Sequence, residues 1–443
     1  MKNSLAKRFL GNTGWLLTTN IYSMILSLVI GSLSARYLGP SNYGLIGYGT
    51  SLIMLFTSIS KLGLDSVVIN ELVVNPAKKG NYLGAALVMR LIASIISIVC
   101  VSIFVSIMEP GNSLLLEITF LQSIAILFQV HEIFNYWFQA ELKSKYFVIA
   151  SCVALTASAV WRIFLLYNGA SVKWFALSIS IQALVILIVT AIIFFQKAPI
   201  TLRVHLNDIK YLISKSRHFI VANLAITIYM QTDKIMIGKM LGEEAVGFYT
   251  AAMTIAMIWQ FVPNAIINSS YSLIISERLN NPKTYIKRLQ MLMLTITLLG
   301  IIVGIVILMF GRWAILALYG VAYEQSIITL YILIWSTGLA VLGSARGIWI
   351  VAEGLNAYQK YMVLIGGVIN VVLNLFTIKL FGINGAAIAT LASQLAVQFI
   401  APLCFKKTRP LAGVYWQSFK LLKTINHKKI QKEIKNQLKV GQK

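Results

Sequence analysis

The residues of this sequence that could do chemistry are charged residues placed within apolar stretches. Asp233 and Lys234 lie inside a stretch that otherwise has the composition of a membrane-spanning helix. A charge in the hydrocarbon core of a bilayer is costly, so such residues are functional-site hypotheses by default. Because successive residues of a helix point about 100° apart, the two side chains cannot face the same partner. We predict that one of them faces a cavity and the other a neighbouring helix.

Five further charged residues lie within or at the edges of apolar stretches, and they are candidates for substrate binding or ion coupling. They are Arg162, Arg346, Arg90, Lys61 and Glu132. A guanidinium group can hold a phosphate through two parallel hydrogen bonds, whereas an ammonium group acts as a point charge. The arginines therefore suit an anionic ligand such as a phosphate or a carboxylate, and Glu132 is a candidate proton carrier.

Each of these charges also has a structural explanation. Arg162 could anchor its helix at the membrane interface, where long basic side chains reach the headgroups. The small neighbours of Arg346 fit close helix packing as well as they fit a cavity. Lys61 and Asp65 are four residues apart and could form an ion pair on one helix face, and Glu132 could pair with a basic residue of another helix. The sequence leaves these alternatives open.

The composition identifies the chain as a multi-pass membrane protein. Of its 443 residues, 58% are hydrophobic and only 12% are charged, and the mean hydropathy is +0.79. A soluble domain has about 25% charged residues. Apolar runs of about 20 residues predict membrane-spanning helices rather than the short alternating strands of a barrel. Twelve spans are predicted, at residues 12–33, 45–69, 82–107, 114–138, 147–167, 174–195, 218–238, 246–274, 289–310, 325–350, 361–380 and 385–405.

The distribution of basic residues predicts the orientation of these spans. The chain has 38 Lys and Arg residues and a formal net charge of +24. With the N-terminus in the cytoplasm, 28 of the 38 fall in cytoplasmic segments and five in outer loops. Basic residues concentrate on the cytoplasmic side of membrane proteins, so both termini are expected there, and the charge requires no nucleic-acid partner. The tail, which could form a basic helix over residues 418–438, either lies on anionic lipid or is solvated.

A repeat divides the chain into two halves. Arg36-Tyr-Leu-Gly39 corresponds to Lys239-Met-Leu-Gly242 at an offset of 203 residues, and Gly44 corresponds to Gly247 at the same offset. Each half has six spans, so both halves have the same orientation. This predicts an all-α integral membrane protein whose two six-helix bundles are parallel repeats around a central cavity. The predicted units are a first bundle over residues 1–195, a cytoplasmic linker over 196–217, a second bundle over 218–405 and a basic cytoplasmic tail over 406–443.

The sequence offers no motif for catalysis or for a resident metal. Its three cysteines and four histidines have no metal-ligand spacing, and it contains no Walker A motif. The longest loops carry no paired carboxylates, which disfavours a membrane polymerase or glycosyltransferase. We therefore expect a protein that is not an enzyme and has no cofactor, with H⁺ or Na⁺ as the coupling ion.

Six short segments, taken in order, resemble the polysaccharide-biosynthesis flippases and in particular their O-antigen (Wzx-type) branch. They are Ala35-Arg-Tyr-Leu-Gly-Pro-Ser-Asn-Tyr-Gly44, Gly63-Leu-Asp65, Phe138-Gln-Ala-Glu-Leu-Lys-Ser-Lys-Tyr146, Thr232-Asp-Lys-Ile-Met-Ile-Gly238, Val246-Gly-Phe-Tyr249 and Gly385-Ala-Ala-Ile-Ala-Thr390. The likeness runs from the first span to the twelfth and leaves out the tail. The family also places an Asp-Lys pair where this chain has Asp233 and Lys234.

The resemblance implies membership of the multidrug/oligosaccharidyl-lipid/polysaccharide exporter superfamily, whose two bundles open alternately to each side of the membrane. It implies a flippase that moves an undecaprenyl-pyrophosphate-linked oligosaccharide from the cytoplasmic to the outer leaflet of the bacterial inner membrane, for O-antigen in lipopolysaccharide or a related polysaccharide. The expected partners are this lipid, the membrane, a polysaccharide polymerase and a chain-length regulator. The alternative is an ion-coupled small-molecule (multidrug) antiporter of the same superfamily, which would have an acidic cavity.

Overall fold

The computed structural model describes residues 2–424, with side chains from residue 21 onward except those of residues 279 and 421–424. Most of the predicted tail helix over 418–438 therefore lies outside the described residues. The described chain is helical and contains no strand. The first half comprises α1 (Lys2–Ser60), α2 (Leu64–Val74), η1 (Pro76–Lys78), α3 (Lys79–Met108), α4 (Ser113–Phe128), α5 (His131–Ala140), α6 (Lys145–Tyr167) and α7 (Val172–Lys197). The second half comprises α8 (Leu206–Leu241), α9 (Glu243–Ile258), α10 (Phe261–Asn280), α11 (Pro282–Leu318), η2 (Val321–Tyr323), α12 (Ser326–Ala352), α13 (Asn356–Phe381), α14 (Ile383–Leu395), η3 (Ala396–Ile400), α15 (Ala401–Cys404) and α16 (Pro410–Thr424).

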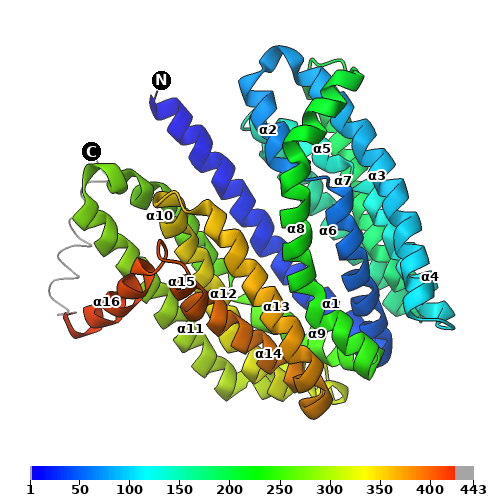
Figure 1. The fold of residues 1–443 in the computed structure, drawn as a ribbon. Coiled ribbons are helices and arrows are strands. Elements are labelled where there is room, and N and C mark those ends of the chain that lie inside the picture. Colours follow the sequence, from blue (N-terminus) through cyan, green and yellow to red (C-terminus); the bar gives the residue numbers. More distant parts are fainter. Residues whose placement is uncertain (1, 425–443) are drawn as a thin grey trace.

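These helices provide the twelve predicted spans. Nine stretches of the described chain are long and apolar enough to cross a membrane, and the bent pair α9–α10 is a tenth. One of the nine, Ile21–Val74, turns back within α1 and so contains two crossings (Figure 1). The remaining span is α8, which is long enough at 36 residues but carries more polar side chains.

Two glycines with the same backbone conformation make equivalent turns in the two halves. Gly39, with φ 71° and ψ 170°, separates the two arms of α1 and is followed by Pro40. Gly242, with φ 91° and ψ 176°, separates α8 from α9. Glycine is the residue that adopts positive φ without strain, and proline cannot continue a helix. The sequence repeat is therefore also a repeat of backbone conformation. We call the side of the molecule that holds these turns the turn side, and the side where α1 begins the terminal side.

The hydrophobic core explains how the two bundles lie against each other. One cluster of buried side chains joins both bundles and includes Tyr48 and Val105 from the first with Tyr249 and Ile315 from the second. A second cluster belongs to the second bundle alone, and a third is built from the first bundle and the beginning of α8. Close packing of these side chains holds the bundles together on the turn side. In Figure 1 they diverge toward the terminal side.

Two segments differ from their predicted boundaries. The predicted linker runs to residue 217, but α8 already begins at Leu206 and buries Leu212 in the cluster of the first bundle. The tail is predicted to be either solvated or bound to lipid, but its described part includes α16, which packs on α11 and buries Leu411 within the second bundle. Both segments have apolar faces, and these faces pack against the protein itself.

Candidate functional site

The turn side is closed by a glycine-to-glycine contact between the bundles. Gly44 on the second arm of α1 packs on Gly247 of α9, and the two are partners in the sequence repeat. A Cβ on Gly44 would lie 1.8 Å from the carbonyl oxygen of Glu243, and a Cβ on Gly247 would lie 2.1 Å from the carbonyl oxygen of Pro40. Small residues allow helix backbones to approach closely inside a membrane. The backbones of the two bundles are therefore in direct contact here.

The repeated basic residues cross between the bundles at the same side. The guanidinium of Arg36 donates to the carbonyl oxygens of Leu316 and Ala317, at 3.0 and 2.6 Å, at the end of α11. The ammonium of Lys239, its partner in the repeat, donates to the carbonyl oxygen of Met108 at the end of α3. Each cation thus neutralises the negative end of the third long helix of the opposite bundle.

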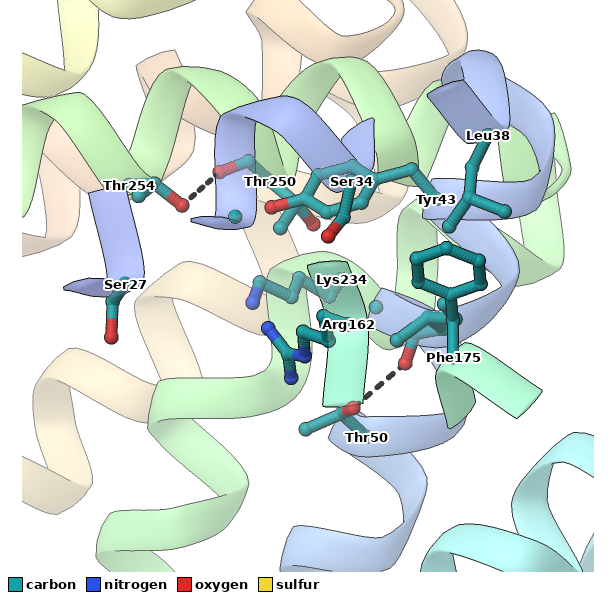
Figure 2. Close-up of a pocket in the computed structure, with 13 residues that line it drawn as sticks. Ser27, Ser34, Leu38, Tyr43, Thr50, Arg162, Phe175, Lys234, Thr250 and Thr254 are labelled. Carbon is teal, nitrogen blue, oxygen red and sulfur yellow. Dashed lines mark hydrogen bonds between the residues drawn. The ribbon is translucent and has the colours of Figure 1, made fainter. Parts of the chain in front are cut away.

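Directly beneath this contact lies a cavity of about 250 Å³ between the two bundles. Its walls come from both arms of α1 and from α6, α7, α8 and α9 (Figure 2). Tyr43 separates it from the turn side, because its ring packs against Tyr319 and Tyr323 of the second bundle. The residues that line it are Ser27, Gly31, Ser34, Leu38, Tyr43, Ile46, Gly47, Thr50, Arg162, Phe175, Lys234, Thr250 and Thr254.

Among the described residues that line this cavity, the only charged ones are two cations, one from each bundle. Arg162 comes from α6 and Lys234 from α8, and Figure 2 shows their side chains next to each other. Among the described residues, neither side chain has a hydrogen bond or a carboxylate within ion-pair distance. Removal of a charge from water is costly unless a partner compensates it. An anionic ligand would supply that compensation.

Asp233, which precedes Lys234 in the sequence, points away from the cavity. Asp233 is only 8% exposed and accepts hydrogen bonds from the side chains of Tyr249 at 2.6 Å, Asn370 at 3.0 Å and Asn374 at 2.8 Å. The hydroxyl of Thr390 donates to it as well. These partners come from α9, α13 and α14, so the pair divides as the helical geometry predicts, with Lys234 at the cavity and Asp233 among neighbouring helices.

Lys61, Arg90 and Glu132 form a separate charge network in the first bundle, away from the cavity. The Glu132 carboxylate bridges the ammonium of Lys61 at 2.9 Å and the guanidinium of fully buried Arg90 at 2.5 Å. The local pair of Lys61 with Asp65 does not form, because Asp65 instead accepts from the hydroxyl of Tyr136. The network ties the end of α1 to α3 and α5.

Arg346 is also outside the cavity. It is 2% exposed in the core of the second bundle, and its guanidinium donates to the carbonyl oxygen of Val397 at 2.5 Å. Of the two explanations that the sequence left open for Arg346, a cavity or close helix packing, its position matches close helix packing. Of the seven predicted site residues, the structure therefore brings Arg162 and Lys234 together at one cavity and places Asp233 directly behind it.

Three polar residues of the cavity wall were missed by the sequence reasoning. Tyr43 lies in the first of the six resembling segments, but it carries no charge, and the predicted site residues are all charged. Thr250 and Thr254 are spaced to share one face of α9, which is the signal that could have found them. All three line the same cavity as the two cations and bring hydroxyl groups to its wall (Figure 2).

Comparisons with known proteins agree with this architecture. Solved structures with the same fold include the lipid II flippase MurJ in an inward closed conformation, with a TM-score of 0.72 at 12% identity over 94% of this chain and 93% of that chain. A multidrug resistance MATE family transporter in an inward-facing conformation has a TM-score of 0.65 at 14% identity, over 90% of this chain and 99% of that chain. A transporter of the MOP superfamily from Pyrococcus furiosus has a TM-score of 0.62 at 14% identity, over 91% of this chain and 96% of that chain. At these identities the likeness shows the fold alone.

Sequence comparison shows the family. The chain is 28% identical over 191 residues to the probable flippase AglR of Haloferax volcanii. This match covers 41% of the chain and 39% of that relative, so it spans well under half the length of the relative. A family model described as polysaccharide biosynthesis protein matches residues 9–277, more than half of the sequence. The chain belongs to the polysaccharide biosynthesis protein family.

Proposed function

We propose that the protein is a flippase for an undecaprenyl-pyrophosphate-linked oligosaccharide, the repeat unit of an O-antigen or a related polysaccharide. The observation that carries this proposal is the cavity between the bundles, whose lining includes two unpaired cations and no acid. A pyrophosphate is multiply charged and accepts hydrogen bonds from a guanidinium fork and an ammonium group together. Arg162 and Lys234 come from different bundles, so a bound pyrophosphate would bridge the two units that must move relative to each other.

Flipping requires no bond to be broken, which fits a cavity without paired carboxylates, and we infer that the protein is not an enzyme. The prenyl chain stays in lipid while the head group crosses between the bundles, which open alternately to each side. The relative AglR is named a probable flippase, and MurJ is a flippase for lipid II. On the far side, a polymerase with its chain-length regulator would consume the product.

The second candidate function, export of cationic small molecules, finds less support at this site. A cation exporter needs acidic groups that face its substrate, but Asp233 is buried behind the cavity and does not line it. Arg162 and Lys234 would repel a cation from the cavity. The charge of the lining residues therefore favours an anionic head group.

The test is made in cells that carry or lack the protein. In spheroplasts without it, the lipid-linked oligosaccharide should be protected from a glycosidase added outside, and a plasmid copy should restore digestion. Equal digestion with and without the protein would contradict the proposal.

A reporter fused after Lys79 should score as cytoplasmic, because the basic segments concentrate on that side, and a reporter fused after Glu244 should score as external.

We further propose that Asp233 and its neighbours hold the coupling ion, and that this ion is Na⁺ rather than H⁺. The cluster offers carboxylate, amide and hydroxyl oxygens, the donors that hard cations take. The side-chain oxygen of Asn374 is buried and has no hydrogen-bond partner. A bound cation could satisfy that acceptor. Binding next to Lys234 would connect the ion to the head-group cavity through α8.

This proposal predicts a sodium-dependent melting temperature for the purified protein. A ligand that binds only the folded state stabilises it by about 2.7 kcal/mol at 100 times its Kd, so Na⁺ should raise the melting temperature relative to the same concentration of K⁺. Asp233→Asn should lose the difference. Glu244→Gln, which changes an exposed acid at the start of α9, is the control and should keep it. Identical melting of the wild type in Na⁺ and K⁺ would contradict a sodium site.

A further inference from the structure

Two further cavities continue from the cation-lined one toward the terminal side. The second, of about 420 Å³, shares Ser27 and Thr254 with the first. The third, of about 370 Å³, shares Asn264 and Asn268 with the second. Among the residues whose side chains the structure describes, none that lines either cavity is charged. The three form a continuous series whose chemistry changes from cationic to neutral.

The third cavity gathers neutral polar side chains from three helices. Asn264, Asn268 and Tyr271 follow one another on α10 at spacings of four and three, which place them on one helix face. Asn356 and Gln359 from the start of α13 line the same cavity, and so does Ser344 of α12. Amides in membrane-spanning helices are rare unless they face partners or a water-filled space.

The amides of this third cavity have no partners within the protein. Among the described residues, the side chains of Asn264, Asn268, Asn356 and Gln359 make no hydrogen bond, and the side-chain oxygen of Gln359 is also buried. Elsewhere in the second bundle the buried side chains of Asn370, Asn374 and Gln398 all donate hydrogen bonds, although the oxygens of Asn374 and Gln398 also lack a partner. Of the cavity amides, Asn268 and Asn356 are exposed, and the buried side-chain oxygen of Gln359 lacks the partner that a buried polar group normally has. A polar ligand in the cavity could supply partners to these amides.

We propose that the third cavity is a binding site for uncharged sugar residues of the lipid-linked oligosaccharide, an inference that rests on the proposed function. A primary amide offers donors and an acceptor together, which matches a sugar hydroxyl that both donates and accepts. Tyr271 adds an aromatic ring, whose apolar face can pack on the C–H face of a sugar. With the pyrophosphate at Arg162 and Lys234, the oligosaccharide would extend through the second cavity to the amides of α10 and α13.

A glycine in the wall of the third cavity allows a steric test. Gly347 lines the cavity, and a Cβ built there meets no atom within 4 Å, so Gly347→Leu should fill the cavity without a backbone clash. Gly31 lines the cation-lined cavity and is equally open, so Gly31→Leu should fill that one instead. Gly413 on α16 is open as well and lines none of these cavities, so Gly413→Leu serves as the control.

The purified full-length variants are compared by native mass spectrometry with two probes. One probe is undecaprenyl pyrophosphate, and the other is the lipid-linked oligosaccharide extracted from cells that lack the transporter. Wild type and Gly413→Leu should bind the oligosaccharide form about tenfold or more tightly than the bare carrier, which corresponds to one or two net hydrogen bonds. Gly347→Leu should lose this advantage and keep its affinity for the bare carrier. Gly31→Leu should weaken the binding of both probes.

The outcomes separate this inference from the proposed function. If Gly347→Leu keeps the full advantage of the oligosaccharide, or if the wild type shows none, the sugar site is overturned while the head-group site stands. If the wild type binds the oligosaccharide but not the bare carrier, and Gly347→Leu abolishes that binding, the sugar site stands and the head-group site fails. Asn264→Ala with Asn268→Ala should reproduce the effect of Gly347→Leu by removing donors rather than space.

Discussion

Replacing either cavity cation should stop transport while the protein still folds and inserts. Lys234→Ala or Arg162→Gln would remove one side of the buried contact proposed for the pyrophosphate. Truncating one partner of such a charge pair costs about 2–5 kcal/mol, or roughly 30- to 4,000-fold in affinity. Neither side chain has a partner among the described residues, so its loss leaves no unpaired group behind. Folding should therefore be preserved or improved. The measurement is surface polysaccharide at matched protein abundance.

Conservative replacements identify what each cation contributes. Lys234→Arg keeps the charge but changes its geometry, so it should retain part of the transport activity. Arg162→Lys keeps the charge but loses the bidentate fork, so its transport activity should lie between those of the wild type and Arg162→Gln. If Arg162 only anchored α6 at the membrane interface, Arg162→Lys would be fully active. Lys173→Gln is the matched control, because this exposed cation at the start of α7 pairs only with exposed Glu117. Wild-type export by Lys234→Ala would remove the head-group site from the proposed function.

The repeat could be predicted from sequence because it is carried by residues whose types are constrained locally. Gly39 and Gly242 are needed for a positive φ, and that requirement acts within a few residues of each turn. Helix spacing likewise predicts that Asp233 and Lys234 face different ways. The number and type of spans follow from length and hydropathy, which are also local properties.

Pairings between helices could not be predicted in the same way. Three partners of Asp233, Asn370, Asn374 and Thr390, come from α13 and α14, more than a hundred residues later. Glu132 likewise pairs across to α3. Spacing indicates which residues share a face of one helix but not which face of another helix lies opposite. Arg36 and Lys239 show this limit: their place at helix ends was readable from sequence, but the helices that they neutralise belong to the opposite bundle.

The contact between Gly44 and Gly247 should control whether the turn side can close. Gly247→Ala would place a methyl group 2.1 Å from the carbonyl oxygen of Pro40, and Gly44→Ala would place one 1.8 Å from that of Glu243. Both obstacles are backbone atoms, so no side-chain rotation can relieve the clash. Overpacking of this kind typically costs about 1–3 kcal/mol, which shifts a two-state equilibrium by roughly 5- to 150-fold away from the closed form. The clash exists only when the bundles meet, so each bundle should still fold.

The expected result is a protein that stays open on the turn side and has lost most of its transport. It is measured with a cysteine placed at Ser34 in the cavity wall, after replacement of Cys100, Cys152 and Cys404, and with a membrane-impermeant maleimide applied from the turn side. Labelling should be slow in the parent and fast in Gly247→Ala, while Gly413→Ala, at an open position of α16, should label like the parent. Slow labelling with full transport in Gly247→Ala would mean that closure does not depend on this contact. The bundles would then have to be held by the contacts of Arg36 and Lys239 with the opposite helices, and their joint replacement by glutamine would become the decisive variant.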